Sequence, residues 1–303
     1  MKNRYILLTA AKDEEACIRD VIEFVVRQTT PPVAWFIMDD GSSDQTAAIV
    51  ESYAAKYPFI HLQSARERGG RNFGSQYKAI LAAYELGRAL EYDFVAVQDA
   101  DQAPERADYY QAIMEDFERN PRLGLASGTI YERPNGRWEF RFENSQDAVA
   151  ASVVFRKECF EKIGGYTPLY YGGSDWLIQL QARKLGWELI TRPDLRILHY
   201  RLSSSAGGIW RGRFRMGLMD ASFGSDAVFE FLKCCRRLPT RPFVLGSVVR
   251  FSGYLWWKIT GRKPLLKADE VAFLRDEQRA KIRKWISFPA AAPVSESSGP
   301  ELA

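Results

Sequence analysis

The chain has 303 residues and a formal net charge of +4, and its 46% hydrophobic and 26% charged residues are typical of an ordinary soluble protein with one large core or two modest ones. The cysteines, Cys17, Cys159, Cys234 and Cys235, show no framework spacing, which excludes a disulfide-stapled fold and favours reduced thiols in the cytoplasm. The N-terminal apolar run is too short for a signal peptide, and no window approaches the roughly eighteen apolar residues of a spanning helix, so we expect neither.

Short apolar runs alternate with stretches of helical spacing in the N-terminal third. We expect strands at Tyr5–Ala10, Val33–Met38, Phe59–Leu62 and Phe94–Gln98, and helices that follow Asp13, run from about Gln45 to Tyr57, and end near Leu90. Asp13 is the expected cap of the first helix. This alternation predicts right-handed βαβ units and a mostly parallel central sheet flanked by helices, a Rossmann-like α/β fold. Loops after successive strands then gather at the carboxyl edge of the sheet, where ligands usually bind.

Beyond Pro104 the α/β character continues to about Arg201 and then changes. We expect a helix to about Arg119, strands at Leu123–Gly128 and Ala151–Phe155, a short helix at Cys159–Ile163, a helix from the Tyr170–Trp176 loop to near Gly186, and two short strands, Trp187–Thr191 and Arg196–His199, around Pro193. We therefore predict an α/β domain over residues 1–201, a helical basic extension over 202–286, and a disordered tail over 287–303.

The stretch Phe94–Pro104, F-V-A-V-Q-D-A-D-Q-A-P, ends an apolar strand abruptly on two acids. In extended backbone, residues i and i+2 face the same side, so Asp99 and Asp101 would converge on one point. Two close carboxylates repel unless one keeps its proton or a cation lies between them, and Mg²⁺ or Mn²⁺ prefers oxygen ligands. An acidic turn without a metal is the alternative that this motif alone leaves open.

Five stretches, taken in order, carry a family resemblance. They are T-A-A-K-D-E-E-A-C-I (Thr9–Ile18), M-D-D-G-S-S-D-Q-T (Met38–Thr46), Q-D-A-D (Gln98–Asp101), G-G-S-D-W (Gly172–Trp176) and R-I-L-H-Y-R (Arg196–Arg201). Together they resemble the family-2 glycosyltransferases, the large inverting group with the A-type nucleotide-sugar (GT-A) fold. The chain departs from the family pattern at Ala10, Asp13 and Ser174, where Pro, Asn and Glu are usual, and Ser174 puts the acceptor class in question.

The resemblance implies a binding site for a nucleotide-diphosphate sugar in the first two loops. Asp40 would accept the N3–H of a uracil-like base, and Asp39 would fix the loop or the ribose. Ala10 and Glu14 occupy the family's opening loop and are expected to line the same site. An Asx-turn that caps the next helix is the alternative for the two aspartates, and both interpretations can hold at once.

The resemblance also implies a metal and phosphate site. Asp99 would face the ribose or the metal, Asp101 the metal, and His199 would supply a third ligand to Mg²⁺ or Mn²⁺. Such a cation would bridge the diphosphate and neutralise charge as the nucleotide leaves. His199 is otherwise a packed structural residue. Arg71 and Arg201 hold the places of arginines near the phosphates, or are solvated loop side chains.

Asp175 is the candidate catalytic base. It would take the proton from an acceptor hydroxyl as that oxygen attacks the anomeric carbon from the face opposite the nucleotide, which inverts the anomeric configuration. The alternative role for Asp175 is to cap the helix of Trp176–Leu185.

The segment from Arg201 to Trp285 carries 18 Lys and Arg against 7 Asp and Glu, so the charge of the chain is uneven. Trp210, Trp256 and Trp257 lie among these basic residues, a pattern typical of an interfacial membrane helix. A plain packing appendage with a solvated rim and a nucleic-acid-binding face are the alternatives, and we expect no nucleic-acid partner.

These features predict an inverting, metal-dependent glycosyltransferase with a nucleotide-diphosphate sugar donor. We expect this donor to be a UDP-sugar. The acceptor would be a glycan or lipid-linked glycan in cell-surface polysaccharide synthesis, at the cytoplasmic face of the inner membrane with peripheral membrane contact. A catalytically inactive nucleotide-sugar-binding or scaffold protein is the main alternative. A nucleotidyltransferase of related fold is another, although the chain has no G-x-G-x-R opening to cradle a triphosphate.

Overall fold

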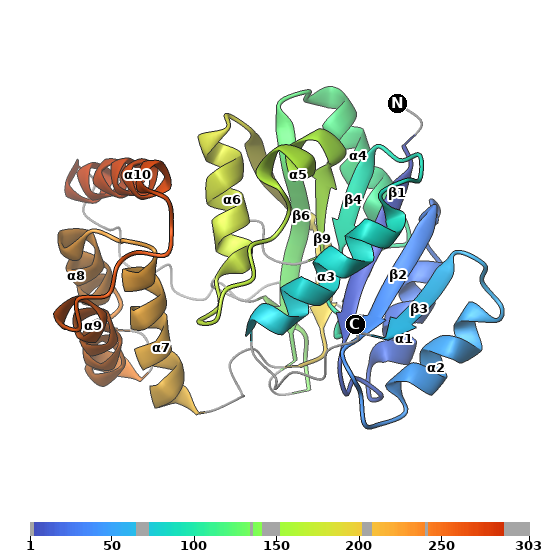
Figure 1. Cartoon of the computed structure of the whole chain (residues 1–303), viewed down its shortest axis with the longest axis horizontal. Helices are drawn as coiled ribbons and strands as arrows, with labels where there is room; N and C mark the ends of the chain where they lie inside the picture. The colour runs from blue at the N-terminus through green and yellow to red at the C-terminus, as the bar shows by residue number, and fades with distance from the viewer. Residues whose placement is uncertain are drawn as a thin grey trace. The chain divides into compact units, whose positions relative to one another are not determined.

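The chain divides into two compact units, Met1–Ala206 and Gly207–Ala303 (Figure 1). The computed structural model describes residues 3–64, 73–133, 136–140, 152–201, 208–239 and 242–287. Arg71 and the expected tail lie outside the described residues.

Four parallel strands form one half of the sheet in the first unit (Figure 1). They are β1 (Tyr5–Ala11), β2 (Ala34–Asp39), β3 (Ile60–Ser64) and β4 (Phe94–Val97), in the order β3-β2-β1-β4. The connecting helices are α1 (Ile18–Val26), α2 (Thr46–Ala54) and α3 (Phe73–Gly87). The predicted βαβ units are confirmed, and the loops after β1, β2 and β4 leave the same edge of the sheet.

Beyond β4 the sheet becomes mixed. The order continues with β8 (Val153–Arg156), β6 (Leu123–Glu132), β9 (Glu188–His199) and β5 (Gln102–Pro104), and the short β7 (Glu139–Phe140) pairs with β6. The helices of this half are α4 (Tyr109–Arg119), α5 (Lys157–Ile163) and α6 (Ser174–Lys184). The α/β fold is confirmed. Among the described strands of this half, β6 and β9 run parallel and the other pairs run antiparallel.

Helices cover both faces of the sheet, as the alternation of side chains along β1 requires. Tyr5 and Leu7 belong to one buried apolar cluster, which includes residues of α1, α2 and α4. Ile6 and Leu8 belong to a second cluster on the opposite face, with residues of α3, α5 and α6. The sheet therefore lies between two helical layers. Because helices cover both of its faces, the loops at the ends of the strands are the part of the sheet available to form a site.

Strand β9 is one continuous strand, so the prediction of two short strands around Pro193 is wrong. That prediction relied on proline having no N–H to donate to a ladder. The β6–β9 register shifts between Gly128 and Thr129, whose partners are Arg192 and Arg196, so β9 bulges at Pro193 without ending.

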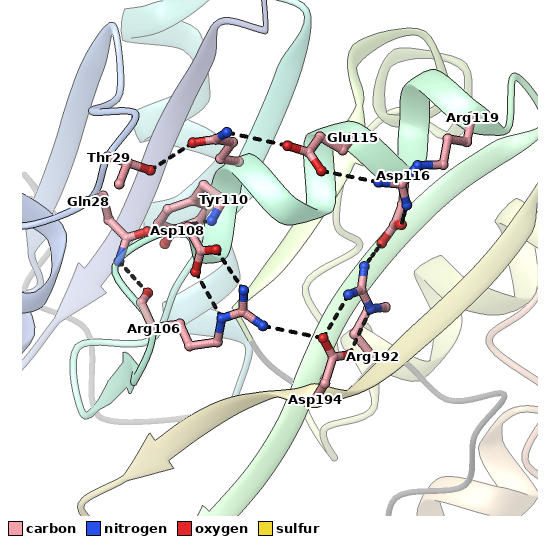
Figure 2. Close-up of polar contacts among 11 residues, drawn as sticks. Gln28, Thr29, Arg106, Asp108, Tyr110, Glu115, Asp116, Arg119, Arg192 and Asp194 are labelled. Atoms are coloured by element: carbon pink, nitrogen blue, oxygen red, sulfur yellow. Dashed lines mark hydrogen bonds and ion pairs between the residues drawn. The ribbon is translucent and has the colours of Figure 1, made fainter.

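The bulge is anchored by an ion-pair network on α4 (Figure 2). Arg192 contacts Asp116 of α4 at 2.5 Å and Asp194 at 2.7 Å. Arg106 contacts Asp194 at 3.4 Å and Asp108 at 2.6 Å, which joins the network to the start of α4. These contacts hold the bulged part of β9 against α4. His199 is the last residue of the same strand.

The second unit is helical, as the sequence predicted, with α7 (Ile209–Ser222), α8 (Ala227–Arg236), α9 (Phe243–Ile259) and α10 (Ala268–Ser287). Helices α7 and α9 cross closely at two glycines. A Cβ atom at Gly217 would lie 1.9 Å from the Arg250 carbonyl oxygen, and one at Gly253 would lie 2.2 Å from the Phe214 carbonyl oxygen. No helix among the described residues is both long and apolar enough to cross a membrane.

Four charged side chains meet between α7, α8 and α9, of which Arg250 and Glu230 are buried and Asp220 and Lys233 are partly buried. Arg250 contacts Asp220 at 2.5 Å and Glu230 at 3.3 Å, and Lys233 contacts the same two carboxylates at 3.1 and 2.8 Å. The pairing satisfies charges that would otherwise be costly to bury. Two basic residues of this segment, Arg250 and Lys233, are therefore engaged in ion pairs inside the second unit.

Candidate active site

The loops after β1 and β2 are locked together by side-chain to backbone hydrogen bonds. Asp13 accepts the Ser43 N–H at 2.8 Å, and Asp44 accepts the Glu15 N–H at 3.0 Å. The prediction that Asp13 caps α1 is wrong, because Cys17 is the N-cap and Asp13 has a φ of 54°. Asp13 braces the neighbouring loop instead.

The β2 loop presents the two aspartates expected at the nucleotide. Asp39 is buried and accepts the Ser42 N–H at 3.1 Å, which braces the loop. This bond reaches the third residue along, and the N-cap of α2 is Gln45, so Asp39 does not form the Asx-turn that would cap the next helix. Asp40 is half-buried, and its carbonyl accepts a 2.9 Å hydrogen bond from Lys12. Ala10, the other expected member of this site, is half-buried at the end of β1 and pairs with Met38 of β2.

Asp99 is held by two side-chain amides where β4 ends. Gln76 of α3 donates to its Oδ1 at 2.7 Å, and Gln102 of β5 donates to its Oδ2 at 3.0 Å. Burial raises the pKa of Asp99 to about 7, with the Asp101 carboxylate adding to the shift. Both carboxylate oxygens of Asp99 are therefore directed at protein donors.

Asp101 meets two basic side chains at the end of β9. Its Oδ2 lies 3.4 Å from Nε2 of His199 and 3.9 Å from Nε of Arg201. Arg201 also pairs with Glu14 from the β1 loop, and Nδ1 of His199 lies 3.1 Å from Oε1 of Glu132. Burial lowers the pKa of His199, but the hydrogen bond to Asp101 and the other carboxylate contacts outweigh it, so the pKa is raised overall.

These residues match part of a metal site. Within the described ranges no three or more His, Cys, Asp and Glu side chains form a group that could hold a metal ion, so the expected set of Asp99, Asp101 and His199 is not assembled. Asp101 and His199 are nevertheless in contact and offer a carboxylate oxygen and an imidazole nitrogen. Magnesium sites commonly use one or two carboxylates plus substrate phosphates and water, and Asp101 supplies one such carboxylate. The neutral imidazole of His199 is a further possible donor to a metal.

Asp175 enters the site on the first turn of α6. Gly172 and Gly173 precede it with φ values of 88° and 90°, a region that favours glycine, and Gly173 is the N-cap of the helix. The alternative in which Asp175 caps the helix is therefore removed. Ser174, where the family resemblance expects Glu, is fully buried, and its hydroxyl has no hydrogen-bond partner within the described part of the chain.

Asp175 and Asp99 line the same cavity, which has a volume of about 70 Å³. One wall is aromatic, because the rings of Tyr77 and Tyr166 stack with centroids 4.7 Å apart. Burial, followed by the charge of Asp175, raises the pKa of Tyr77 well above its ordinary value, so this hydroxyl stays neutral. The cavity combines a carboxylate, a neutral donor and an aromatic face, groups that suit a sugar.

Strand order explains which predicted residues come together. Glu14 follows β1, which lies between β2 with Asp40 and β4 with Asp99, so the three loops are neighbours. The β5–β9 pairing brings His199 to the same end.

Three further residues contact the predicted site residues and were not expected from the sequence, namely Gln76, Gln102 and Glu132. Gln102 lies three residues after Asp99 in a motif already singled out, so its position was a usable signal. Gln76 and Glu132 come from α3 and β6 and have no motif of their own, because their contacts arise from tertiary packing.

The chain is similar in sequence and in fold to known glycosyltransferases. The family model described as "Glycosyl transferase family 2" matches residues 7–173. The poly-β-1,6-N-acetyl-D-glucosamine synthase of Staphylococcus aureus (strain COL) is 29% identical over 231 residues, which are 69% of this chain and 52% of the synthase. Across the synthases that it matches, the chain spans between 27% and 52% of their length.

Two solved structures have a similar fold. The Pyrobaculum calidifontis mannosyltransferase PcManGT, in complex with GDP-Man and Mn²⁺, has a TM-score of 0.55 at 16% identity, and the match covers 94% of this chain and 83% of that one. S. aureus TarS 1–349, in complex with UDP-GlcNAc, has a TM-score of 0.55 at 15% identity, with coverage of 89% and 78%. At this identity the likeness concerns the fold alone.

Proposed function

The chain belongs to glycosyl transferase family 2, and on that premise we propose that it is an inverting glycosyltransferase. It transfers a sugar from a nucleotide-diphosphate sugar, a UDP-sugar, to a hydroxyl of a glycan or lipid-linked glycan acceptor. The process that it serves is cell-surface polysaccharide synthesis. The similarity to poly-β-1,6-N-acetyl-D-glucosamine synthases supports this assignment.

The observation that carries the proposal is the cavity shared by Asp175 and Asp99. Asp99 follows β4 at the edge where nucleotides bind in such sheets, and Asp175 approaches from α6. Asp175 takes the proton of the acceptor hydroxyl while that oxygen attacks the anomeric carbon, and the nucleotide departs from the opposite face. One displacement of this kind inverts the anomeric configuration.

The donor occupies the edge formed by the β1, β2 and β4 loops. Asp40 accepts the base N3–H, Asp39 holds the loop through the hydrogen bond that it accepts from the Ser42 N–H, and Ala10 lets the donor approach the end of β1. Glu14 holds Arg201, which faces the diphosphate as a neighbour of Asp101. Arg71 has the same role in this proposal.

Asp101 and His199 would be the protein ligands of a Mg²⁺ or Mn²⁺ ion in the donor site. When bound, such an ion stabilises the negative charge that develops on the departing diphosphate. Asp99 lies beside this pair and orients the donor through the oxygens that Gln76 and Gln102 position.

Peripheral membrane contact through the second unit is part of the proposal. The exposed face of α9 carries Val244, Val248, Leu255, Trp256 and Ile259, which are 41% to 79% exposed. Lys258 and the basic residues at 262 and 263 follow at its C-terminal end, a combination typical of interfacial helices. The attachment places the enzyme at the cytoplasmic face of the inner membrane, close to a lipid-linked acceptor.

A panel of nucleotide sugars with Mn²⁺, read out by release of the nucleoside diphosphate, tests the proposal. Turnover of one donor that stops in Asp175→Asn supports a glycosyltransferase. Tight donor binding without turnover would identify a binding or scaffold protein instead. Release of pyrophosphate from a nucleoside triphosphate would identify a nucleotidyltransferase.

A further inference from the structure

Glu132 contacts His199 from the neighbouring strand. Its Oε1 lies 3.1 Å from Nδ1 of His199, and the two side chains are 16% and 11% exposed. Glu132 and His199 are also register partners in the parallel β6–β9 pairing. Two paired strands therefore fix the contact, rather than a loop that can move.

The opposite nitrogen of the same ring faces the candidate metal ligand. Nε2 of His199 lies 3.4 Å from Oδ2 of Asp101, while Nδ1 faces Glu132. An ionised carboxylate only accepts hydrogen bonds, so Glu132 favours the tautomer in which Nδ1 carries the proton and donates to it. A histidine that donates through one nitrogen to a carboxylate presents the other to a cation, with its ring orientation fixed.

We propose that Glu132 is a positioning residue for a divalent cation at the nucleotide-sugar site. It holds His199 in the tautomer and orientation in which Nε2, together with Asp101, binds Mn²⁺ or Mg²⁺. This inference rests on the proposed function, because the cation reaches the site with the donor diphosphate.

A purely structural role for Glu132 would make a different prediction. Glu132 would then stabilise the β6–β9 pairing, and its loss would lower thermal stability without changing the affinity for metal. The two roles are separated by measuring metal binding and unfolding on the same variants.

The β6–β7 ladder offers a matched control. Glu139 of β7 is the register partner of Glu132, and its side chain is exposed. Glu139→Ala therefore removes a carboxylate from the same strand pair with no effect expected on His199. Glu132→Gln keeps an oxygen that accepts from Nδ1–H but removes the charge, and Glu132→Ala removes both.

The experiment titrates Mn²⁺ into the full chain with saturating UDP and measures free Mn²⁺ by electron paramagnetic resonance. We expect the dissociation constant for Mn²⁺ to rise about 10- to 100-fold in Glu132→Ala, the usual cost of losing a partner of a metal-binding histidine. The rise should be several-fold in Glu132→Gln, and Glu139→Ala should match the unaltered chain. Electron spin echo modulation should show ¹⁴N coupling to Mn²⁺ in the unaltered chain and a weaker coupling in Glu132→Ala.

A dissociation constant within twofold of the unaltered value in Glu132→Gln and Glu132→Ala would overturn the inference. If Glu132→Ala does not fold, the nearly isosteric Glu132→Gln decides alone. Mn²⁺ bound with UDP but without ¹⁴N coupling would overturn the inference and leave a metal-dependent transferase in place. If the unaltered chain binds no Mn²⁺ with UDP, the inference fails, and sugar transfer in the presence of EDTA would show that the proposed transferase survives it.

Discussion

The Gln76 amide donates a 2.7 Å hydrogen bond to Oδ1 of Asp99 and so ties α3 to the end of β4. Gln102 takes the other oxygen, which leaves Asp99 oriented by protein groups while Asp101 faces His199. The two acids of one motif are therefore divided between two tasks. Asp99 holds a fixed position in the cavity, and Asp101 is available to a cation.

This division predicts unequal effects on metal-dependent donor binding. Asp101→Ala should weaken UDP affinity in Mn²⁺ about tenfold or more, and EDTA should have the same effect on the unaltered chain. Asp99→Asn should retain a response to EDTA. Calorimetry with UDP gives all three values. An affinity that EDTA and Asp101→Ala both leave unchanged would count against a metal at this site.

The position of Asp175 predicts a loss of rate rather than of donor binding. Asp175→Asn keeps the shape of the side chain but cannot take a proton, and loss of a general base typically costs about 10²-fold or more in kcat. UDP affinity should stay within a few-fold, because the base acts on the acceptor. Glu158→Gln changes an exposed carboxylate of α5 and is the control. A fully active Asp175→Asn enzyme would move the base elsewhere.

The first unit shows what local patterns can and cannot predict. The apolar runs of β1, β2 and β4 identified the strands because each is buried on both faces. Motif order then predicted Asp99, Asp101, Asp175 and His199 as site residues, of which Asp99 and Asp175 line one cavity and Asp101 and His199 are in contact. The direction of β8 and β5 was not predictable, since strand direction beyond β4 depends on long-range pairing.

The anchoring partners of the site were not predictable for the same reason. Gln76 and Glu132 lie 23 and 67 residues from the side chains that they contact. For Asp13 the local sequence signal was present but wrong. It predicted a helix cap, but a tertiary contact takes the side chain. The neighbouring loop offers it the Ser43 amide and hydroxyl instead.

The crossing of α7 and α9 predicts opposite outcomes for two glycines of one helix. Gly217→Ala should destabilise the protein by several kcal/mol, because its Cβ would lie 1.9 Å from a carbonyl oxygen of α9 and the helices would have to separate. Gly212→Ala, with no atom within 4 Å, should be neutral or stabilise by up to about 1 kcal/mol through helix propensity. Urea unfolding of both variants measures the difference. Equal stabilities of the two variants would show that α7 and α9 can accommodate a methyl group at Gly217 without separating.

The network around Arg192 predicts a pH-dependent contribution to stability (Figure 2). Arg192 lowers the pKa of Asp194 by a side-chain hydrogen bond, and Arg106 lowers that of Asp108 in the same way. A carboxyl with a lowered pKa in the folded state stabilises the fold above its unfolded pKa of about 4, and this stability is lost as the pH falls through the folded value.

Arg192→Ala should therefore reduce the free energy of unfolding at pH 7 by about 1 kcal/mol, a modest value because Asp194 is half-exposed and screened by solvent. The difference from the unaltered chain should shrink near pH 3. Denaturant unfolding at both pH values tests this, with Arg88→Ala, which removes an exposed pair on α3, as the control. A loss of equal size at both pH values would assign the effect to packing.

The last prediction concerns membrane attachment by α9. Trp256 is 55% exposed, whereas Trp257 is 4% exposed and belongs to the core of the second unit, so this prediction concerns Trp256 and not Trp257. Each basic side chain near an anionic leaflet contributes about 1 kcal/mol to binding, and salt weakens this contribution. An inserted indole adds apolar burial.

We expect the full chain to co-sediment with anionic vesicles at low salt and to be released as salt rises. Trp256→Ala combined with Ile259→Ala should weaken this binding about tenfold. Leu86→Ala changes an apolar residue of α3 that is 49% exposed and should leave the binding unchanged. Partitioning of all three proteins into the supernatant with anionic and neutral vesicles alike would leave this face without a lipid partner.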